Sequence, residues 1–291
     1  MKSRSRATHN CVVVLFSLLW SSAFVAGKIA VADVNPLMVL VLRFMVGVIL
    51  LLPFCLSFAA KKQPLFDKKL MANGLLLGTL NNAVYLGLTF TALLYIPASL
   101  VVVIVSCAPF ITLLLSRFFG LERIRLLQVA GIATGFTGVL IISGVSSLSG
   151  AGLTGIALAM GGTISFAVGT VYFRGRGQGV RLRDMNFWQS VAGVLVLAPF
   201  ALNQENAFAW PSASAWLAIA YLALVVTVGG MALWFWLIKE DGPTAASSYH
   251  LMNPMFGVLL SSIFLGTSVT FTDLLGSVVI GLGLFMTMQK R

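Results

Sequence analysis

Charged residues are scarce in this sequence. Only 9% of its 291 residues are Asp, Glu, Lys or Arg, whereas 59% are hydrophobic. A soluble domain carries about 25% charged residues, and no soluble core could hide this much apolar surface. The composition therefore excludes a soluble protein and predicts an integral membrane protein. Carboxylates are the scarcest charged groups, and none lies in the middle of an apolar run. A proton relay through a buried carboxylate is therefore not expected.

Cysteine and histidine are also rare. Cys11, Cys55 and Cys107 lie in or beside apolar runs without forming a Cys-x-x-Cys pair, so we expect small buried side chains. His9 and His250 are far apart in the sequence, and no metal site is expected. The sequence has no phosphate-binding glycine signature, no Gly-x-Ser-x-Gly elbow and no kinase or ATPase motif. These absences argue against a membrane enzyme, and no cofactor is expected.

What the sequence does contain is a series of long apolar runs. A membrane-spanning helix needs about 20 mostly apolar residues, and polar breaks divide the chain into ten such runs. The longest stretch is split at Pro97, because proline suits the first turn of a new helix. We therefore expect an all-α membrane protein with ten transmembrane helices. The expected spans are 10–31, 36–59, 70–93, 97–118, 125–144, 152–173, 186–202, 213–238, 243–265 and 270–288.

The basic residues orient these ten spans. With the N-terminus inside, the inner segments hold 17 of the 19 lysines and arginines, and the outer loops hold none. Basic residues remain on the cytoplasmic side, so both termini are expected to be cytoplasmic. This distribution accounts for the net charge of +11 without nucleic-acid binding. The 17 residues are Lys2, Arg4, Arg6, Lys61, Lys62, Lys68, Lys69, Arg117, Arg123, Arg125, Arg174, Arg176, Arg181, Arg183, Lys239, Lys290 and Arg291.

The second half of the chain repeats features of the first. Pro109 and Pro254 both lie deep in apolar runs, 145 residues apart. Each half holds five spans, an odd number, so the second half would cross the membrane in the opposite sense. The sequence therefore predicts two inverted five-helix repeats, 1–146 and 147–291. Other matches at a spacing of 145 or 146 are Trp20 with Phe166, Lys28 with Arg174, Arg43 with Gln189, Pro97 with Pro243, Gly131 with Gly276 and Gly138 with Gly283.

Inverted repeats are characteristic of secondary transporters, which bind substrate near the middle of the membrane between the two halves. A proline within a span frees a carbonyl and lets the helix bend. Pro109 and Pro254 are therefore candidate hinges for alternating access; the alternative is a pair of fixed kinks needed for packing. Glycines near the end of each half predict close helix packing, including a possible dimer face between spans 5 and 10. They are Gly131, Gly135, Gly138, Gly276, Gly281 and Gly283.

Polar and aromatic residues inside the spans are the candidates for substrate binding. Asparagines could instead bond to a neighbouring helix, His250 could be a neutral packing residue, and tyrosines could sit at any helix interface. Trp188 and Trp234 are weaker candidates for the apolar walls, and for Trp234 and Trp236, near the inner end of span 8, a role as interfacial anchors is favoured. The candidates are Asn81, Asn82 and Tyr85 in span 3, Tyr249, His250 and Asn253 in span 9, and Trp20, Phe24 and Phe166 as apolar walls.

Two basic residues lie within the expected spans. Lys28, towards the outer end of span 1, could extend to water or contact a substrate carboxylate. Arg43, about eight residues into span 2, is expected to bond to helix carbonyls or a lipid phosphate rather than to substrate. His250 could titrate near neutral pH, but a single histidine gives little support for proton coupling. Facilitated diffusion down the substrate gradient is therefore the hypothesis for the energy source.

Three stretches resemble the EamA family of the drug/metabolite transporter superfamily, and the resemblance covers nearly the whole chain. It implies ten helices in two inverted repeats and export of small metabolites across a bacterial inner membrane. The YddG-type branch of aromatic amino-acid exporters is most similar, which implies amino acids as substrates. Thr267 departs from the family, which usually has a glutamate there. The stretches are LLWSSAFVAGKIAVADVNPLMVLVLRF (18–44), ASLVVVIVSCAPFITLLLSRFFGLERIRLLQVAGIATGFTGVLII (98–142) and GPTAASSYHLMNPMFGVLLSSIFLGTSVTFTDLLGSVVIGLGLFMT (242–287).

Alternatives remain open at this point. An exporter of other small metabolites or of cationic drugs belongs to the same class, but a cation exporter would need a membrane-embedded acidic residue. A channel-like pore belongs to a different class, and saturable counterflow would exclude it. The expected partners are a small-molecule substrate and the lipid bilayer, and the chain is expected to be a monomer or a homodimer.

Overall fold

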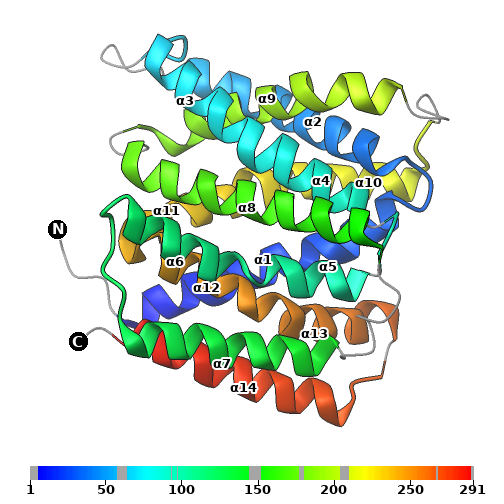
Figure 1. Cartoon of the computed structure of the whole chain (residues 1–291). Coiled ribbons are helices and arrows are strands. Elements are labelled where there is room, and N and C mark those ends of the chain that lie inside the picture. Colours follow the sequence, from blue (N-terminus) through cyan, green and yellow to red (C-terminus); the bar gives the residue numbers. More distant parts are fainter. Residues whose placement is uncertain are drawn as a thin grey trace.

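The computed structural model of the chain describes residues 6–57, 64–92, 94–96, 98–143, 152–176, 180–203, 210–266 and 268–289, and all regular secondary structure in these residues is helical. The helices lie side by side and cross the molecule in roughly one common direction (Figure 1). They are α1 Arg6–Ala30, α2 Pro36–Ser57, α3 Lys68–Gly78, η1 Thr79–Tyr85, α4 Leu86–Ala92, α5 Ala98–Val105, α6 Ala108–Phe118, α7 Leu126–Ser143, α8 Leu153–Arg176, α9 Leu182–Leu202, α10 Ala213–Tyr221, η3 Leu222–Gly230, α11 Met231–Asp241, α12 Pro243–Ser248, η4 Tyr249–Met252, α13 Asn253–Leu265 and α14 Phe271–Met288.

Nine helical segments in the described residues are long and apolar enough to cross a membrane. They match nine of the ten expected spans, and a multi-span membrane protein is confirmed. The remaining expected span, 243–265, is helical but divided into α12, η4 and α13, and it is not among the nine. Several predicted features lie outside the described residues: Pro97, Thr267, Lys2, Arg4, Lys61, Lys62, Lys290, Arg291 and the boundary between the predicted halves.

Local side-chain chemistry explains where several helices begin. The Asp67 carboxylate accepts a hydrogen bond from the Leu70 amide at 2.9 Å, which caps α3. The Ser212 hydroxyl caps α10 in the same way. Thr270 and Asp273 form a reciprocal capping box at the start of α14. Each cap satisfies backbone N–H groups that the first turn of a helix leaves unpaired.

Pro109 and Pro254, the matched prolines, each mark a break in regular α-helix. Pro109 lies in the first turn of α6, directly after α5 ends at Val105. Pro254 lies in the first turn of α13, directly after the 3-10 turn η4. Proline is tolerated at such a position because the first-turn N–H groups have no intrahelical partner anyway. The two prolines therefore start new helical segments rather than interrupting continuous ones.

Two other spans contain a π-helical middle. η1 joins α3 to α4, and η3 joins α10 to α11, without a break in either helix. A π-helix replaces i→i−4 hydrogen bonds with i→i−5 bonds and occurs frequently at functional sites. These two segments supply several of the polar residues described below.

Glycines allow α7 and α14 to pack closely along their lengths (Figure 1). A Cβ added to Gly138 would lie 2.6 Å from the Gly276 carbonyl oxygen, and one added to Gly131 would lie 2.6 Å from that of Gly283. Close packing by these glycines is therefore observed within a single chain. A Cβ added to Gly281 would meet no atom within 4 Å, so Gly281 takes no part in the contact.

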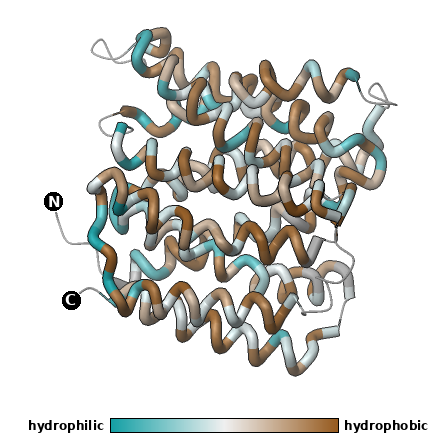
Figure 2. The backbone as a smooth tube through the Cα atoms, in the orientation of Figure 1, coloured by the Kyte–Doolittle hydropathy of each residue, from teal (hydrophilic) through white to brown (hydrophobic). Residues whose placement is uncertain are grey.

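The outer surface is apolar. Leu126, Phe118 and Phe271 are each more than three-quarters exposed, and many other large hydrophobic side chains are exposed to a lesser degree. Hydrophobic residues run along the helices, and hydrophilic ones gather towards helix ends and connections (Figure 2). An apolar belt of this extent fits a hydrocarbon environment rather than water.

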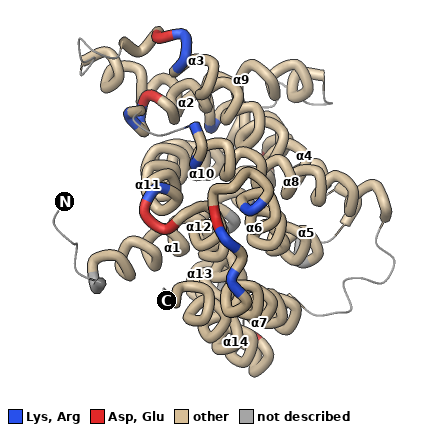
Figure 3. Tube along the Cα trace, turned by 60° about the vertical axis from the view of Figure 1, so that its left-hand side comes forward, with Lys and Arg blue, Asp and Glu red and all other residues tan. Residues whose placement is uncertain are grey.

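Most basic residues of the described chain gather at one end; Lys28, near the end of α1, and Arg43, in the middle of α2, lie elsewhere. α1 starts and α14 ends at this end (Figure 1), and Figure 3 turns it towards the viewer with the lysines and arginines in blue. The starts of α3 and α9 and the ends of α8 and α11 contribute to it. We refer to it as the basic end.

Candidate functional site

Five aromatic side chains meet in the interior of the bundle, and we call them the aromatic cage: Phe16, Trp20, Phe166, Trp234 and His250. The imidazole of His250 contacts the other four rings, with centroid distances of 5.3 Å to Phe16, 5.0 Å to Trp20, 5.1 Å to Phe166 and 4.9 Å to Trp234. The Trp234 indole also stacks on Phe16 at 5.5 Å and on Phe166 at 5.3 Å. Each such pair contributes about 0.5–1.5 kcal/mol beyond its buried area.

Four elements from distant parts of the chain bring these rings together. Phe16 and Trp20 are one helical turn apart on α1 and so share a face. Phe166 comes from α8 and Trp234 from α11. His250 lies in η4, so the break that precedes Pro254 is what presents its ring to the cage.

Two buried donors in the cage have no hydrogen-bond partner. The Asn253 amide nitrogen lies 3.1 Å from His250 Nδ1, and the Asn253 amide oxygen accepts from Ser21 at 3.4 Å. An amide nitrogen can only donate, so Nδ1 accepts and Nε2 carries the proton of the neutral ring. That Nε2 and the Trp234 Nε1 are both buried without a partner. Buried donors are normally satisfied, so two orphans in one cage suit a ligand with acceptor groups.

The structure brings several predicted residues to the cage. Trp20, Phe166 and His250 are members, and Asn253 contacts His250 directly. Tyr85 borders the cage, with its ring 4.8 Å from that of Phe166. The side chain of Phe24, predicted to be a further wall, lies outside the described residues.

Other predicted residues have separate roles. The Asn82 amide donates to the Gln189 carbonyl oxygen at 3.0 Å and so links η1 to α9. Asn81 is buried against Gly169 of α8, and neither atom of its amide has a partner. The Tyr249 hydroxyl donates to Asp241 at 2.9 Å. Lys28 is exposed near the end of α1, two turns beyond Trp20 and so about 12 Å along the axis.

Sequence reasoning misplaced one cage residue and overlooked another. For Trp234, a weaker wall candidate, the role of interfacial anchor was favoured, but the residue is fully buried in the cage. Its helix continues to Asp241, beyond the expected end at 238. Phe16 had no polar or repeat signal of its own. Its position one turn before Trp20 was the clue that could have identified it.

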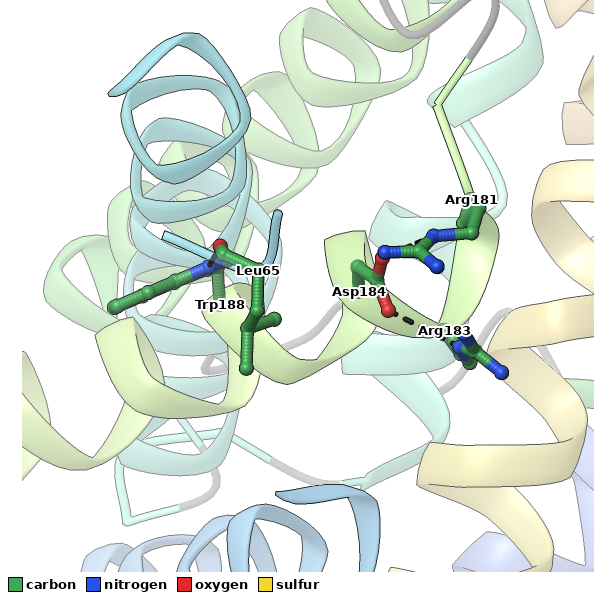
Figure 4. A network of polar contacts seen from close by, with 5 residues as sticks. All are labelled: Leu65, Arg181, Arg183, Asp184 and Trp188. Carbon is green, nitrogen blue, oxygen red and sulfur yellow. Dashed lines mark hydrogen bonds and ion pairs between the residues drawn. The ribbon is translucent and has the colours of Figure 1, made fainter. Parts of the chain in front are cut away.

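Trp188 has a structural role at the basic end (Figure 4). Its indole N–H donates to the Leu65 carbonyl oxygen at 2.9 Å, which fastens the segment before α3 to α9. In the first turn of α9, the buried Asp184 pairs with Arg181 at 2.5 Å and with Arg183 at 3.1 Å (Figure 4). Two cations therefore compensate the charge of this carboxylate. The positive N-terminal end of the helix stabilises it further.

A second buried group of polar side chains, which we call the polar cluster, lies beside the cage: Arg43, Asn186, Ser190 and Thr227. Arg43 Nε donates to the Thr227 hydroxyl at 2.7 Å, so it bonds to a side chain and not to the carbonyl or lipid phosphate predicted for it. The Asn186 amide donates to the Thr227 carbonyl oxygen at 2.6 Å. The cluster joins α2 and α9 to the π-helix η3.

The basic end carries a contact between distant parts of the chain. The Thr244 hydroxyl donates to the Glu122 carboxylate at the start of α12. Gly242 has φ +88°, and a Cβ there would collide with the same carboxylate, so both its conformation and its neighbour require glycine. Burial raises the pKa of Glu122, although hydrogen bonds from Thr244 and the charges of Arg174 and Arg125 oppose the shift.

The cage in this structure is closed. Rings with centroids about 5 Å apart are already in contact, and a further ring fits among them only if the helices that carry them separate. The donors of the cage and the Arg43 guanidinium of the polar cluster can bind acceptor groups. The described residues of both groups include no pair of a nucleophile and a base.

Comparisons with known proteins agree on a transporter. The model of the EamA-like transporter family matches residues 8–144 and again residues 153–289. The "Uncharacterized inner membrane transporter YedA" of Escherichia coli (strain K12) is 34% identical over 251 residues, covering 85% of this chain and 80% of that protein. A "Probable amino-acid metabolite efflux pump" of Salmonella typhimurium (strain LT2) is 25% identical over 286 residues, covering 94% and 93%. A solved crystal structure, 21% identical, has a TM-score of 0.81 and covers 98% of this chain and 97% of its own, which shows the same fold.

Proposed function

The chain belongs to the EamA-like transporter family, and from this membership we propose that it exports amino acids, including aromatic and apolar ones, by alternating access. The aromatic cage is the observation that carries the proposal. It offers apolar walls for a side chain and unpaired donors for polar groups, which is the combination that a small-molecule site needs. The name of the Salmonella relative, an amino-acid metabolite efflux pump, points to the same class of substrate.

Helix packing supports a pair of equivalent halves. In the first half, α1 packs on α13 and on α10 and η3; in the second, α8 packs on α6 and on α4 and η1. The correspondence holds for whole spans: α13 and α6 belong to spans 9 and 4, and the other contacts belong to spans 8 and 3. Within these spans, α1 meets the beginning of span 8, whereas α8 meets the end of span 3. A pseudo-twofold axis in the membrane plane would pair the spans in this way. We therefore propose ten spans in two inverted five-helix repeats, 1–146 and 147–291, with the divided segment 243–265 as the ninth span.

The proposed orientation places the basic end in the cytoplasm. Basic residues of the described chain gather where α1 starts and α14 ends, and such residues remain on the cytoplasmic side. Both termini are then cytoplasmic. The YedA relative is named as an inner membrane protein, which favours a bacterial inner membrane.

Transport in this proposal requires the cage to open towards one side at a time. Trp20 on α1 and Phe166 on α8 contribute equivalent walls, so movement of one half relative to the other would part the rings. The turn before Pro109 and the 3-10 turn before Pro254 are the proposed hinges, because each interrupts the regular α-helical hydrogen bonding of its span. No carboxylate belongs to the cage or the polar cluster, and we therefore propose facilitated diffusion rather than proton coupling.

Counterflow in liposomes tests the function. Vesicles loaded with unlabelled phenylalanine should accumulate labelled phenylalanine, leucine and threonine from outside, saturably and without an imposed pH gradient. Trp20→Ala should lower this uptake, whereas Trp210→Ala, at an exposed tryptophan outside the cage, should not. Uptake without saturation would indicate a channel-like pore. Accumulation driven by a proton gradient alone would refute facilitated diffusion, and no uptake of any amino acid would refute the substrate class.

A further inference from the structure

A guanidinium lies buried in the middle of α2 without an ionic partner. Arg43 is only 7% exposed. Its Nε donates to Thr227, and its Cζ lies 5.5 Å from the centre of the Phe44 ring. Within the part of the chain that the structure describes, no carboxylate pairs with it. Burying an unpaired charge costs several kcal/mol, so this arrangement favours a ligand that supplies the opposite charge.

Two neighbouring polar atoms are also unpaired. The Ser190 hydroxyl and the Asn186 amide oxygen are buried without a hydrogen-bond partner. Gly47, one turn beyond Arg43 on α2, faces the Ser190 hydroxyl: a Cβ on Gly47 would lie 3.5 Å from Ser190 Oγ and 3.6 Å from Thr227 Cγ2. Ser190 and the Arg43 partner Thr227 therefore flank the same face of α2. Asn186 is one turn before Ser190 on α9 and so shares its face.

These atoms are complementary to the head group of an amino acid. The guanidinium and the serine hydroxyl can donate to a carboxylate, and an amide oxygen can accept from an ammonium group. Lipid is an unsuitable source of the anion, because α2 packs against α9 and η3 on this side and Ser190 is fully buried.

The polar cluster adjoins the aromatic cage by two routes. Arg43 lies close enough to the Tyr85 hydroxyl for an electrostatic interaction, and the Tyr85 ring contacts Phe166. On η3, Thr227 is three residues before Gly230, where a Cβ would lie 3.8 Å from the Trp20 ring. A head group in the polar cluster would therefore leave its side chain directed towards the cage.

We propose that Arg43, with Ser190 and Asn186, binds the carboxylate and ammonium groups of the transported amino acid, while the aromatic cage binds its side chain. This inference rests on the proposed function and specifies it: the solute must carry a carboxylate. The subsite disfavours cationic drugs as substrates, because Arg43 would repel them.

A ligand-dependent change in thermal stability tests the subsite without requiring transport. The full chain in detergent is heated with phenylalanine, with 3-phenylpropionate, which keeps only the carboxylate, or with phenethylamine, which keeps only the ammonium. We expect the two carboxylates to raise the unfolding temperature of the wild type and phenethylamine to leave it unchanged. Arg43→Gln should abolish the shift, and Arg43→Lys should retain part of it.

Ser190→Ala and Ser116→Ala form a matched pair. Each removes one buried, unpaired hydroxyl, but Ser116 lies on α6, outside the polar cluster. We expect Ser190→Ala to weaken carboxylate binding about tenfold or more, since the mutant lacks a hydrogen bond to a charged group. Ser116→Ala should bind like the wild type. If Arg43→Gln fails to fold, the comparison of Ser190→Ala with Ser116→Ala still tests whether the polar cluster binds the carboxylate.

The outcomes separate the subsite from the function. Equal carboxylate binding by the wild type and Arg43→Gln, or by Ser190→Ala and Ser116→Ala, would overturn the subsite even if amino acids are transported. Absence of any carboxylate-dependent shift in the wild type would overturn it as well. A shift that depends on Arg43, in a protein that fails to carry amino acids in liposomes, would support the subsite and refute the proposed function.

Discussion

Trp20 and Phe166 pack against the same imidazole, with their ring centroids 5.0 and 5.1 Å from that of His250. The two residues are 146 positions apart and lie on the helices that begin the two matched parts of the chain, α1 and α8. The cage thus draws a wall from each part. A movement of one part relative to the other changes the cage directly.

Removing either wall should weaken binding of an aromatic solute. We expect Trp20→Ala and Phe166→Ala each to raise the apparent KM for phenylalanine about tenfold, because loss of an aromatic contact of about 1.4 kcal/mol corresponds to that factor. In the double variant, the loss of binding free energy should be smaller than the sum of the two single losses, since both rings contact His250. Counterflow at several phenylalanine concentrations measures the effect, and unchanged KM values in both single variants would contradict a role for the cage.

The proline breaks should govern the speed of transport more than binding. Pro254→Ala lets α13 continue backwards into η4 and favours a straighter segment. We expect the turnover rate to fall several-fold while the affinity measured by thermal shift stays within about twofold. Pro199→Ala, at a proline within the continuous helix α9, is the control and should keep the wild-type rate. Equal turnover rates for Pro254→Ala and the wild type would contradict the hinge role of Pro254 and favour a fixed kink needed only for packing.

The Glu122 contact should make stability depend on pH. Burial raises its pKa above the ordinary value of 4.5, so the folded state binds the proton more tightly than the unfolded state. This group therefore favours the fold at low pH, and its contribution is lost as pH rises from 4.5 through the raised value. In detergent, Glu122→Gln should remove that part of the decline in unfolding temperature. Glu240→Gln, at an exposed carboxylate, should retain it.

The contact between α7 and α14 can be tested with two glycines on the same helix. A Cβ at Gly283 would lie 2.5 Å from the Gly131 carbonyl oxygen, whereas one at Gly281 would meet nothing within 4 Å. We expect Gly283→Ala to destabilise the protein by about 1–3 kcal/mol through overpacking. Gly281→Ala should be neutral or slightly stabilising because alanine favours a helix. Thermal unfolding in detergent compares the two, and equal midpoints would contradict the packing described.

Hydrophobic run length and proline position predicted most of the fold, because both act locally. Nine expected spans correspond to helices, and the prolines mark the predicted interruptions. The π-helices η1 and η3 were not predicted, since neither contains a proline that would mark a departure from α-helix. They depend on the packing of neighbouring helices, which a single sequence does not reveal.

The site was predictable only in part. Repeat matching and residue type identified Trp20, Phe166 and His250. Trp234 was misjudged because its depth depends on a helix that extends beyond the expected end. The partner of Arg43 could not be anticipated, because Thr227 is 184 residues away and reaches it through tertiary packing. Hydrophobic periodicity predicts local secondary structure, but it does not show which distant side chains will be in contact.

The glycine seam between α7 and α14 also bears on how the protein is made. Gly138 and Gly283 are 145 residues apart, and at about 5–20 residues per second the ribosome needs roughly 7 to 30 s to pass from one to the other. Throughout that interval α7 lacks the helix that covers its glycine face in the folded protein. The newly inserted chain therefore waits, with one of its closest contacts unmade, until nearly its last helix has entered the bilayer. A chain cut short before α14 would keep that glycine face uncovered and offer it to the membrane's quality-control proteases.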